Sequence, residues 1–306
     1  MDKAIKHHFQ KGIKEKTRLT GGYTFQTWLL TLSDNQKVVF RTQRDFDTGG
    51  GRKIIIADIL EREKYFYESV NKKIGHICPE VFVVDGTREH FAMSYCVMEY
   101  IEGTPLASCF NDFDTQAKND VMYKIGEISA KINNIEIDSN HPYITNRTSW
   151  EDYMANRLKE RFMALLKNNV IIQDEIDEIV NNMRQKKAIK THSFLHLDMR
   201  RINMIFNNGN IFILDAENCE FGDPLFELAT IDVANEISAP LIDGYKNAYN
   251  KTIDLDGELY QYYKMERFSL VLDVFMNAVK SDTESTKYYL EKFHETKNKL
   301  LAERRS

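Results

Sequence analysis

The chain has 306 residues, which fits one large domain or two lobes and allows a sizeable core without disulfides or metal. Hydrophobic residues make up 42% of the chain and charged residues 28%, and this ordinary globular composition excludes disorder as its main state. The net charge of −5 argues against nucleic acid as the main partner.

Cysteine usage and hydropathy bear on the compartment. The four cysteines are widely spaced and form no C-x-x-C pair, so we expect neither a zinc site nor a disulfide framework. No apolar run approaches the roughly 20 residues that a membrane span needs, and the polar N-terminus lacks a signal-peptide core. The sequence therefore predicts a cytoplasmic protein without a membrane partner.

The first part of the chain favours strands. Residues 1–16 form either a short polar helix or a loose end. After Gly21 and Gly22, the predicted elements are a hairpin of Phe25–Leu32 and Lys37–Gln43, a helix over 57–73, and strands over 81–85 and 93–101.

Beyond residue 103 the pattern becomes helical. Three amphipathic stripes begin near Val121, Trp150 and Ile172, and Thr148 or Ser149 is the expected cap of the second. We therefore predict an α+β architecture of two lobes. A small β-rich N-terminal lobe covers residues 1–102 with a hinge at 99–102, and a larger helical lobe covers 103–306.

One non-helical stretch carries candidate chemistry. Asn208-Gly209 is a strong signal for a two-residue hairpin turn, and that turn places Asn203 opposite Leu214. Asp215 follows directly, so Asn203 and Asp215 meet at the open end of the hairpin. Hard oxygen ligands of this kind suit Mg²⁺ and a phosphate better than zinc.

Taken singly, such residues are more often turn formers than catalytic groups. Taken together, they form the pattern His196-x-Asp198-x₄-Asn203, a hairpin, and then Ile213-Leu214-Asp215. This order matches the kinase arrangement of a catalytic-loop Asp, an Asn five residues later, and a metal-binding Asp after the next strand.

The sequence resembles the aminoglycoside phosphotransferase and choline kinase-like family, which has the protein-kinase-like fold. The resemblance covers nearly the whole chain. It rests on LTGGYTFQTW, VVFR, EREK, CVMEYIEGTPL, HLDMRRIN and ILDAENCEFGDPLFELA, of which the last three in this order are highly specific.

The resemblance implies a catalytic set. Asp198 is the catalytic base or orienter that accepts the proton of the substrate hydroxyl. Asn203 and Asp215 hold Mg²⁺, and His196 braces the loop.

The resemblance also implies a site for ATP or GTP. Gly21 and Gly22 lie over the phosphates, and Glu63 pairs with the strand cation Arg41. The backbone of the hinge residues Glu99 and Ile101 meets the purine edge.

Three positions depart from the usual pattern. Arg41 stands where many kinases carry Lys, although choline kinase-like members also use Arg, and its fixed charge can grip phosphate. Leu197 replaces the Gly typical of the antibiotic kinases, and Glu227 stands where an Asp usually follows the GDP turn. None of these changes removes a catalytic group.

A charge count bears on the substrate. The segment from Ala216 to Tyr260 holds ten acids and two bases, so it carries −8 while the rest of the chain carries +3. Most such acids form a solvated face, but acids near the site would attract a cation. Glu217, Asp232 and Glu236 are the candidates for contacting the substrate.

These features predict a Mg²⁺-dependent kinase that acts on a hydroxyl of a small cationic molecule. The first choice of substrate is an aminoglycoside or related antibiotic, which implies a role in antibiotic resistance. The second is a metabolic amino-alcohol or sugar, as in choline kinase-like enzymes. A catalytically silent kinase-like binding protein is the remaining alternative, and the presence of Asp198, Asn203 and Asp215 argues against it.

Overall fold

The structure is a computed structural model that describes residues 1–19, 25–43, 56–138, 140–145, 149–186, 192–277, 279 and 282–302. It divides into two compact units. The first unit comprises Met1–Asp112 and Arg201–Cys219, and the second comprises Phe113–Arg200 and Glu220–Ser306. Each unit is therefore built from two separate stretches of the chain.

The first unit contains a five-stranded antiparallel sheet in the order β1-β2-β3-β5-β4. The strands are β1 (Ile13–Leu19), β2 (Phe25–Leu32), β3 (Lys37–Gln43), β4 (Val81–Asp85) and β5 (Tyr95–Glu99). The predicted hairpin of β2 and β3 is confirmed with the same bounds. In this register Arg41 pairs with Thr27 on one side and Cys96 on the other, so it lies on the central strand.

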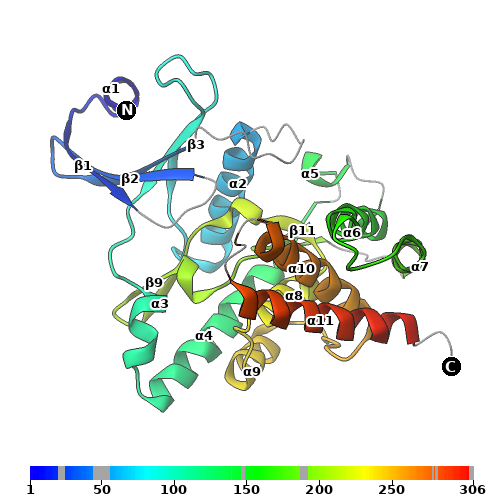
Figure 1. The fold of residues 1–306 in the computed structure, drawn as a ribbon. Helices are drawn as coiled ribbons and strands as arrows, with labels where there is room; N and C mark the ends of the chain where they lie inside the picture. The colour runs from blue at the N-terminus through cyan, green and yellow to red at the C-terminus, as the bar shows by residue number, and fades with distance from the viewer. Residues whose placement is uncertain are drawn as a thin grey trace. The chain divides into compact units, whose positions relative to one another are not determined.

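Helices and short strands complete the first unit. They are α1 (Asp2–Phe9), α2 (Ile56–Ile74), β6 (Thr104–Pro105), α3 (Leu106–Cys109), η1 (Phe110–Asp112), η2 (Arg201–Asn203), β9 (Met204–Asn207), β10 (Asn210–Ile213) and η3 (Ala216–Asn218). The predicted helix over 57–73 is thus confirmed as α2, which packs beside β4 and β5. Figure 1 shows α2 next to this sheet.

The N-terminal segment is more ordered than the sequence indicated. Residues 2–9 form helix α1, whose Ala4 and Ile5 are fully buried against the sheet. Residues 13–16, expected in a short polar helix or a loose end, lie in β1. β1 is an edge strand with mostly exposed side chains, so its ladder with β2 stabilises it without an alternating apolar pattern.

The second hairpin has the predicted register. Phe206 pairs with Ile211, and the Leu214 amide donates to the Asn203 carbonyl at 2.8 Å. β9 also pairs with β6, which gives a three-stranded sheet in the order β10-β9-β6. Asn203 and Asp215 therefore stand at the open end of this hairpin.

The second unit is mainly helical. Its elements are α4 (Thr115–Asn133), β7 (Glu136–Ile137), α5 (Pro142–Thr145), α6 (Trp150–Lys167), α7 (Gln173–Arg184), β8 (His192–Leu195), β11 (Glu220–Gly222), α8 (Pro224–Val233), α9 (Ala239–Ala248), α10 (Glu258–Asn277) and α11 (Thr283–Ala302). The predicted cap Ser149 accepts from the Asp152 amide, whereas Thr148 lies outside the described residues. Ile172 was expected on a packed stripe but precedes α7 and is 59% exposed.

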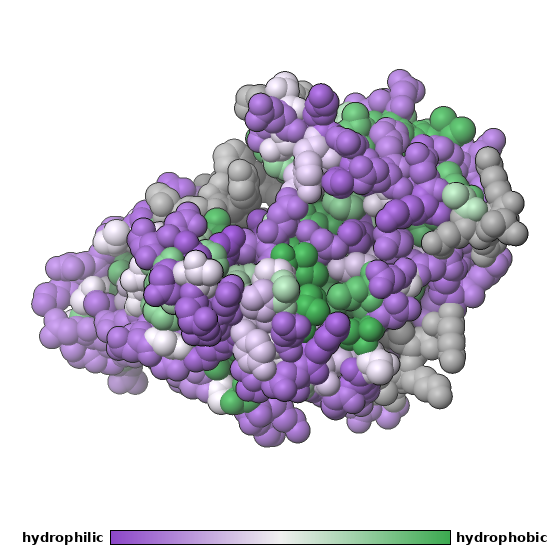
Figure 2. All heavy atoms as spheres, turned by 90° about the horizontal axis from the view of Figure 1, so that it is seen from below, coloured by the Kyte–Doolittle hydropathy of each residue, from purple (hydrophilic) through white to green (hydrophobic). Residues whose placement is uncertain are grey.

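The exposed apolar side chains of the described residues lie apart in the sequence. Figure 2 shows a face that is largely hydrophilic, with smaller hydrophobic areas between polar residues. The exposed large apolar side chains of the described residues are spread over several elements, among them Met163, Ile202 and Val274. Among the helices that the structure describes, none is long and apolar enough to cross a membrane.

Candidate active site

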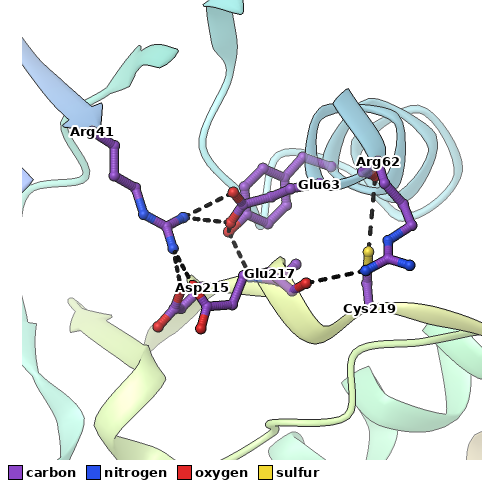
Figure 3. Close-up of polar contacts among 8 residues, drawn as sticks. Arg41, Arg62, Glu63, Asp215, Glu217 and Cys219 are labelled. Atoms are coloured by element: carbon purple, nitrogen blue, oxygen red, sulfur yellow. Dashed lines mark hydrogen bonds and ion pairs between the residues drawn. The ribbon is translucent and has the colours of Figure 1, made fainter. Parts of the chain in front are cut away.

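Arg41 is the centre of a buried ion cluster in the first unit (Figure 3). Its Nη1 donates to both carboxylate oxygens of Glu63, at 2.7 and 2.8 Å. Its Nη2 donates to Asp215 Oδ1 at 2.5 Å and to Glu217 Oε2 at 3.1 Å. Arg41 is 7% exposed, and the Phe25 ring lies 4.3 Å from its guanidinium carbon. The predicted pairing partners Arg41 and Glu63 are thus in contact.

The protonation of Arg41 follows from these contacts. Burial disfavours its charge, but the carboxylates of Glu63 and Asp215 outweigh burial and raise the pKa of Arg41 well above its ordinary value. The guanidinium is therefore permanently charged, and it connects strand β3 and helix α2 to the turn after β10.

The turn at Asp215 brings two carboxylates to one guanidinium nitrogen. Asp215 precedes η3 in a left-handed backbone conformation, with φ 62° and ψ 53°. Asp tolerates this region better than most residues because it is short and polar. Figure 3 shows Asp215 and Glu217 both pointing toward Arg41.

The cluster gathers charges of both signs. The Arg41 guanidinium faces the carboxylates of Glu63, Asp215 and Glu217, and Arg62 Nη2 donates to the Glu217 carbonyl at 3.4 Å. The Asp215 side chain is 36% exposed, so it remains accessible. An exposed carboxylate oxygen of this kind is the type of ligand that a divalent cation such as Mg²⁺ prefers.

Asp198 lies in the second unit, in the loop after β8. Arg200 donates to both of its carboxylate oxygens, from Nε to Oδ1 and from Nη2 to Oδ2. The Asp198 amide donates to His196 Nδ1 at 3.2 Å, and His196 is fully buried. Backbone and side chain of Asp198 are therefore both held by neighbouring residues.

Glu227 of α8 fixes the same loop from inside the second unit. Its carboxylate accepts from the amides of His196 and Leu197, the latter at 3.0 Å. Leu197 has φ 60°, a conformation that a bulky side chain rarely adopts. The position at which the antibiotic kinases carry Gly is thus left-handed here, and Glu227 helps to hold it there.

Burial acts strongly on Glu227. It raises the pKa of Glu227 to about 7, against the lowering by the Leu197 and His196 amides and by Arg267. Arg267 also donates to the Leu197 carbonyl at 3.5 Å. The loop that presents Asp198 therefore rests on a buried acid whose charge changes near neutral pH.

The remaining predicted nucleotide-site residues are only partly described. Gly21 and Gly22 lie outside the described residues. Glu99 ends β5, where its carboxylate accepts from the Glu80 amide at 3.1 Å. Ile101 follows it and is 8% exposed. These two hinge residues stay predictions.

The three predicted substrate acids are divided between the units. Glu217 lies on Arg41 in the first unit. Asp232 in α8 forms an ion pair of 2.6 Å with Lys264 and accepts from the Tyr260 hydroxyl at 3.0 Å. The Glu236 amide donates to the Ile231 carbonyl. The carboxylates of Glu217 and Asp232 are thus paired with Arg41 and Lys264.

Two contacts of the site residues were not predicted from the sequence. The Tyr67 hydroxyl donates to Glu63 Oε1 at 2.9 Å, and Arg200 holds Asp198. Tyr67 stands four residues after Glu63, so helical spacing could have placed it on the same face. No comparable signal distinguishes Arg200 from Arg201 in the sequence.

The chain is similar to a protein family and to several solved structures. The model of the phosphotransferase enzyme family matches residues 16–262. A search of curated proteins gives no match.

Solved structures share the fold at low sequence identity. A thermostable mutant of aminoglycoside phosphotransferase APH(4)-Ia in the apo form is 15% identical, with a TM-score of 0.69 over 98% of this chain and 99% of that chain. Another such mutant, in a ternary complex with ADP and hygromycin B, has 15% identity and a TM-score of 0.67 over 97% and 98%. ADP-bound aminoglycoside phosphotransferase APH(2'')-Ib has 15% identity and a TM-score of 0.64 over 97% of both chains.

These findings define the class as a protein-kinase-like two-lobe α+β fold, with a small antiparallel sheet and a larger helical part. The chain belongs to the phosphotransferase enzyme family, as the resemblance implied. It is therefore a phosphotransferase.

Proposed function

We propose that this phosphotransferase moves the γ-phosphoryl group of ATP or GTP to a hydroxyl of a cationic hydroxylated compound. An aminoglycoside or related antibiotic is the proposed acceptor, and resistance to that antibiotic is the proposed role. The ternary complex of the similar APH(4)-Ia mutant with ADP and hygromycin B supports this choice. So does the net charge of −8 between Ala216 and Tyr260.

The cluster around Arg41 carries the proposal. A permanently charged guanidinium, held by Glu63 and placed beside Asp215, supplies a fixed donor for nucleotide phosphates. Structures with ADP and with AMP-PNP among the similar proteins support a nucleotide co-substrate. Gly21, Gly22, Glu99 and Ile101 complete the proposed nucleotide site.

Asn203 and Asp215 would hold Mg²⁺, and the oxygen donors of these side chains, with Asp215 36% exposed, fit such an ion. When bound, the ion neutralises charge on the nucleotide phosphates. Asp215 would offer its exposed carboxylate to the ion, and Glu63 would hold Arg41 through its two hydrogen bonds.

Asp198 would accept the proton of the acceptor hydroxyl. Arg200 fixes the orientation of this carboxylate through both oxygens, so an incoming hydroxyl has to share Asp198 with Arg200. Glu227 and His196 hold the backbone of the loop, which limits the movement of Asp198 during transfer.

Two observations favour a second candidate, a metabolic amino-alcohol or sugar kinase of the choline kinase-like type. The strand cation is Arg41, which such enzymes also use, and Leu197 occupies the left-handed position where antibiotic kinases carry Gly.

We also propose a cytoplasmic location, which the four free cysteines support because reducing compartments keep thiols unpaired.

A nucleotide-consumption assay with an acceptor panel tests the proposal. The purified chain is supplied with Mg²⁺ and either ATP or GTP, together with aminoglycosides, peptide antibiotics, choline or small sugars. We expect acceptor-dependent consumption with at least one aminoglycoside. Consumption with choline or a sugar alone would favour the second candidate.

Asp198→Ala is the matched control. We expect this variant to lose transfer while it keeps nucleotide binding, because Asp198 serves the acceptor hydroxyl. Turnover close to that of the wild type would contradict the role of Asp198. Consumption that no acceptor stimulates would argue against the proposed function itself.

A further inference from the structure

Tyr67 occupies an unusual position beside the Arg41 cluster. It lies in α2 one helical turn after Glu63 and is 1% exposed. Its hydroxyl donates to Glu63 Oε1 at 2.9 Å and accepts from the Ala216 amide at 3.1 Å. Burial and the nearby Glu63 raise the pKa of Tyr67 well above its ordinary value, so the hydroxyl keeps its proton and remains a donor.

These two bonds close a ring of contacts within the first unit. Arg41 contacts Glu63, Glu63 contacts Tyr67, and Tyr67 contacts the amide of Ala216. Ala216 stands between Asp215 and Glu217, and both of these carboxylates return to Arg41. The hydroxyl of Tyr67 thus joins α2 directly to the turn bearing Asp215, alongside the bond from Arg62 Nη2 to the Glu217 carbonyl at 3.4 Å (Figure 3).

The Ala216 amide needs such a partner. It is the first amide of η3, and amides at the start of a helix have no acceptor inside it. A side chain at the cap position serves the second or third amide of a helix, so it does not supply this acceptor. In the part of the chain that the structure describes, the Asp215 side chain caps no amide of η3, because it is directed at Arg41.

Tyr67 supplies this acceptor from another element, and the Asp215 carboxylate is directed at Arg41. The hydroxyl also fixes the peptide that follows the left-handed residue Asp215, a conformation that persists only when its surroundings hold it.

We propose that Tyr67 is a positioning residue of the phosphoryl-transfer site, which sets the aim of Asp215 and of the Glu63–Arg41 pair. This inference rests on the proposed roles of Asp215 in metal binding and Arg41 in nucleotide binding. Under this proposal Glu63 has a second partner besides Arg41, and this partner holds helix α2 and the turn at Asp215 together.

Tyr67→Phe tests the inference, because it removes the hydroxyl and keeps the ring. Tyr95→Phe is the matched control. It also removes a buried hydroxyl in the first unit, one that donates to Asp85 at 2.8 Å away from Arg41. Mg-nucleotide affinity is measured by calorimetry over a range of Mg²⁺ concentrations, and steady-state constants are measured for both substrates.

For Tyr67→Phe we expect the half-saturating Mg²⁺ concentration and the nucleotide KM to rise by about tenfold, the effect of one lost buried hydrogen bond. The acceptor KM should stay at its wild-type value. The Mg²⁺ effect should disappear when Asp215→Asn is already present, since the hydroxyl acts through Asp215. Tyr95→Phe should change thermal stability alone.

Two outcomes separate the inference from the proposed function. Wild-type Mg²⁺ and nucleotide constants in Tyr67→Phe, with a melting temperature lowered as in Tyr95→Phe, would overturn the inference alone. A wild-type chain that binds no Mg-nucleotide would overturn the proposed function, and the inference with it.

Discussion

Among single residues, Glu227 combines burial with hydrogen bonds to the loop that presents Asp198. Its carboxylate accepts from the amides of His196 and Leu197, and burial raises its pKa to about 7 from an ordinary 4.5. In the unfolded chain the group ionises near its ordinary pKa. Between about pH 4.5 and about pH 7 the folded chain therefore holds a proton that the unfolded chain has lost.

This linkage predicts the effect of Glu227→Gln. In the wild type, Glu227 makes stability fall as the pH rises through that window and level off above about pH 7. Gln cannot ionise, so the variant should lose this part of the slope. Melting temperatures of both proteins across the window measure the difference. Parallel curves would contradict the assignment.

Arg41 is a second single residue whose substitution gives a testable prediction. Arg41→Ala leaves the buried Glu63 without its cation and removes the donor for phosphates, so nucleotide affinity or turnover should fall steeply. Arg41→Lys should recover part of it, because a point charge still binds phosphate but cannot contact Glu63 and Asp215 with separate nitrogens. Nucleotide titrations of the two variants check this order, and full activity of Arg41→Ala would show that another cation does the work.

At the scale of elements, local signals predicted much of the fold. The β2–β3 hairpin, α2 and β4 follow from alternation, turn residues and helical periodicity, and the Asn208-Gly209 turn gave the correct pairing of the second hairpin. β1 could not be predicted in this way, because an edge strand with exposed side chains depends on its neighbour rather than on its own pattern. The contacts of Tyr67 with Ala216 escaped for a similar reason, since 149 residues separate them in sequence.

Helices α4 and α9 pack closely through two glycines. A Cβ at Gly244 would lie 2.0 Å from the Tyr123 carbonyl oxygen, and one at Gly126 would lie 1.9 Å from that of Leu241. Backbone carbonyls cannot move aside as a flexible side chain can. The two helices therefore approach each other more closely than side chains would permit.

Gly244→Ala should separate these helices. An alanine gains about 1 kcal/mol of helix propensity, but overpacking costs about 1–3 kcal/mol or more. We expect a net loss of about 2 kcal/mol, visible as a lower urea midpoint. Gly12→Ala is the control, because a Cβ there meets no heavy atom within 4 Å. Equal midpoints for the two variants would contradict close packing of α4 and α9.

Over the whole molecule, the uneven distribution of charge predicts that binding of a cationic acceptor depends on salt. Charges in solution are screened over roughly 8 Å at physiological ionic strength. The acceptor KM should therefore rise with added salt more than the nucleotide KM, once the effect of salt on Mg-nucleotide binding is measured separately. If salt has little effect and an uncharged polyol reacts as well as a polyamine, the acceptor is a neutral sugar.

Asp232→Asn and Glu236→Gln test the same field at single positions. Asp232→Asn also leaves Lys264 without its ion-pair partner, which adds local positive charge. Both variants should raise the KM of a cationic acceptor and leave the nucleotide KM nearly unchanged. Unchanged acceptor constants in both variants would show that these acids are ordinary surface.

The discontinuous first unit has a consequence for how the chain comes to be folded during synthesis. β6 pairs with β9, and the Ile77 carbonyl accepts from the Ile213 amide. Residues 113–200 lie between the two partners of each pair, so they leave the ribosome before the second partner does. Closing a loop of this length costs only a little more free energy than closing a shorter one. It slows folding, however, because partners that are distant in sequence must meet. A nascent chain that has emerged only to residue 112 therefore lacks two strands and the turn at Asp215. All five strands of the larger sheet are then available, but the sheet of β6, β9 and β10 must remain incomplete while the first helices of the second unit are already available. The first unit therefore finishes folding late.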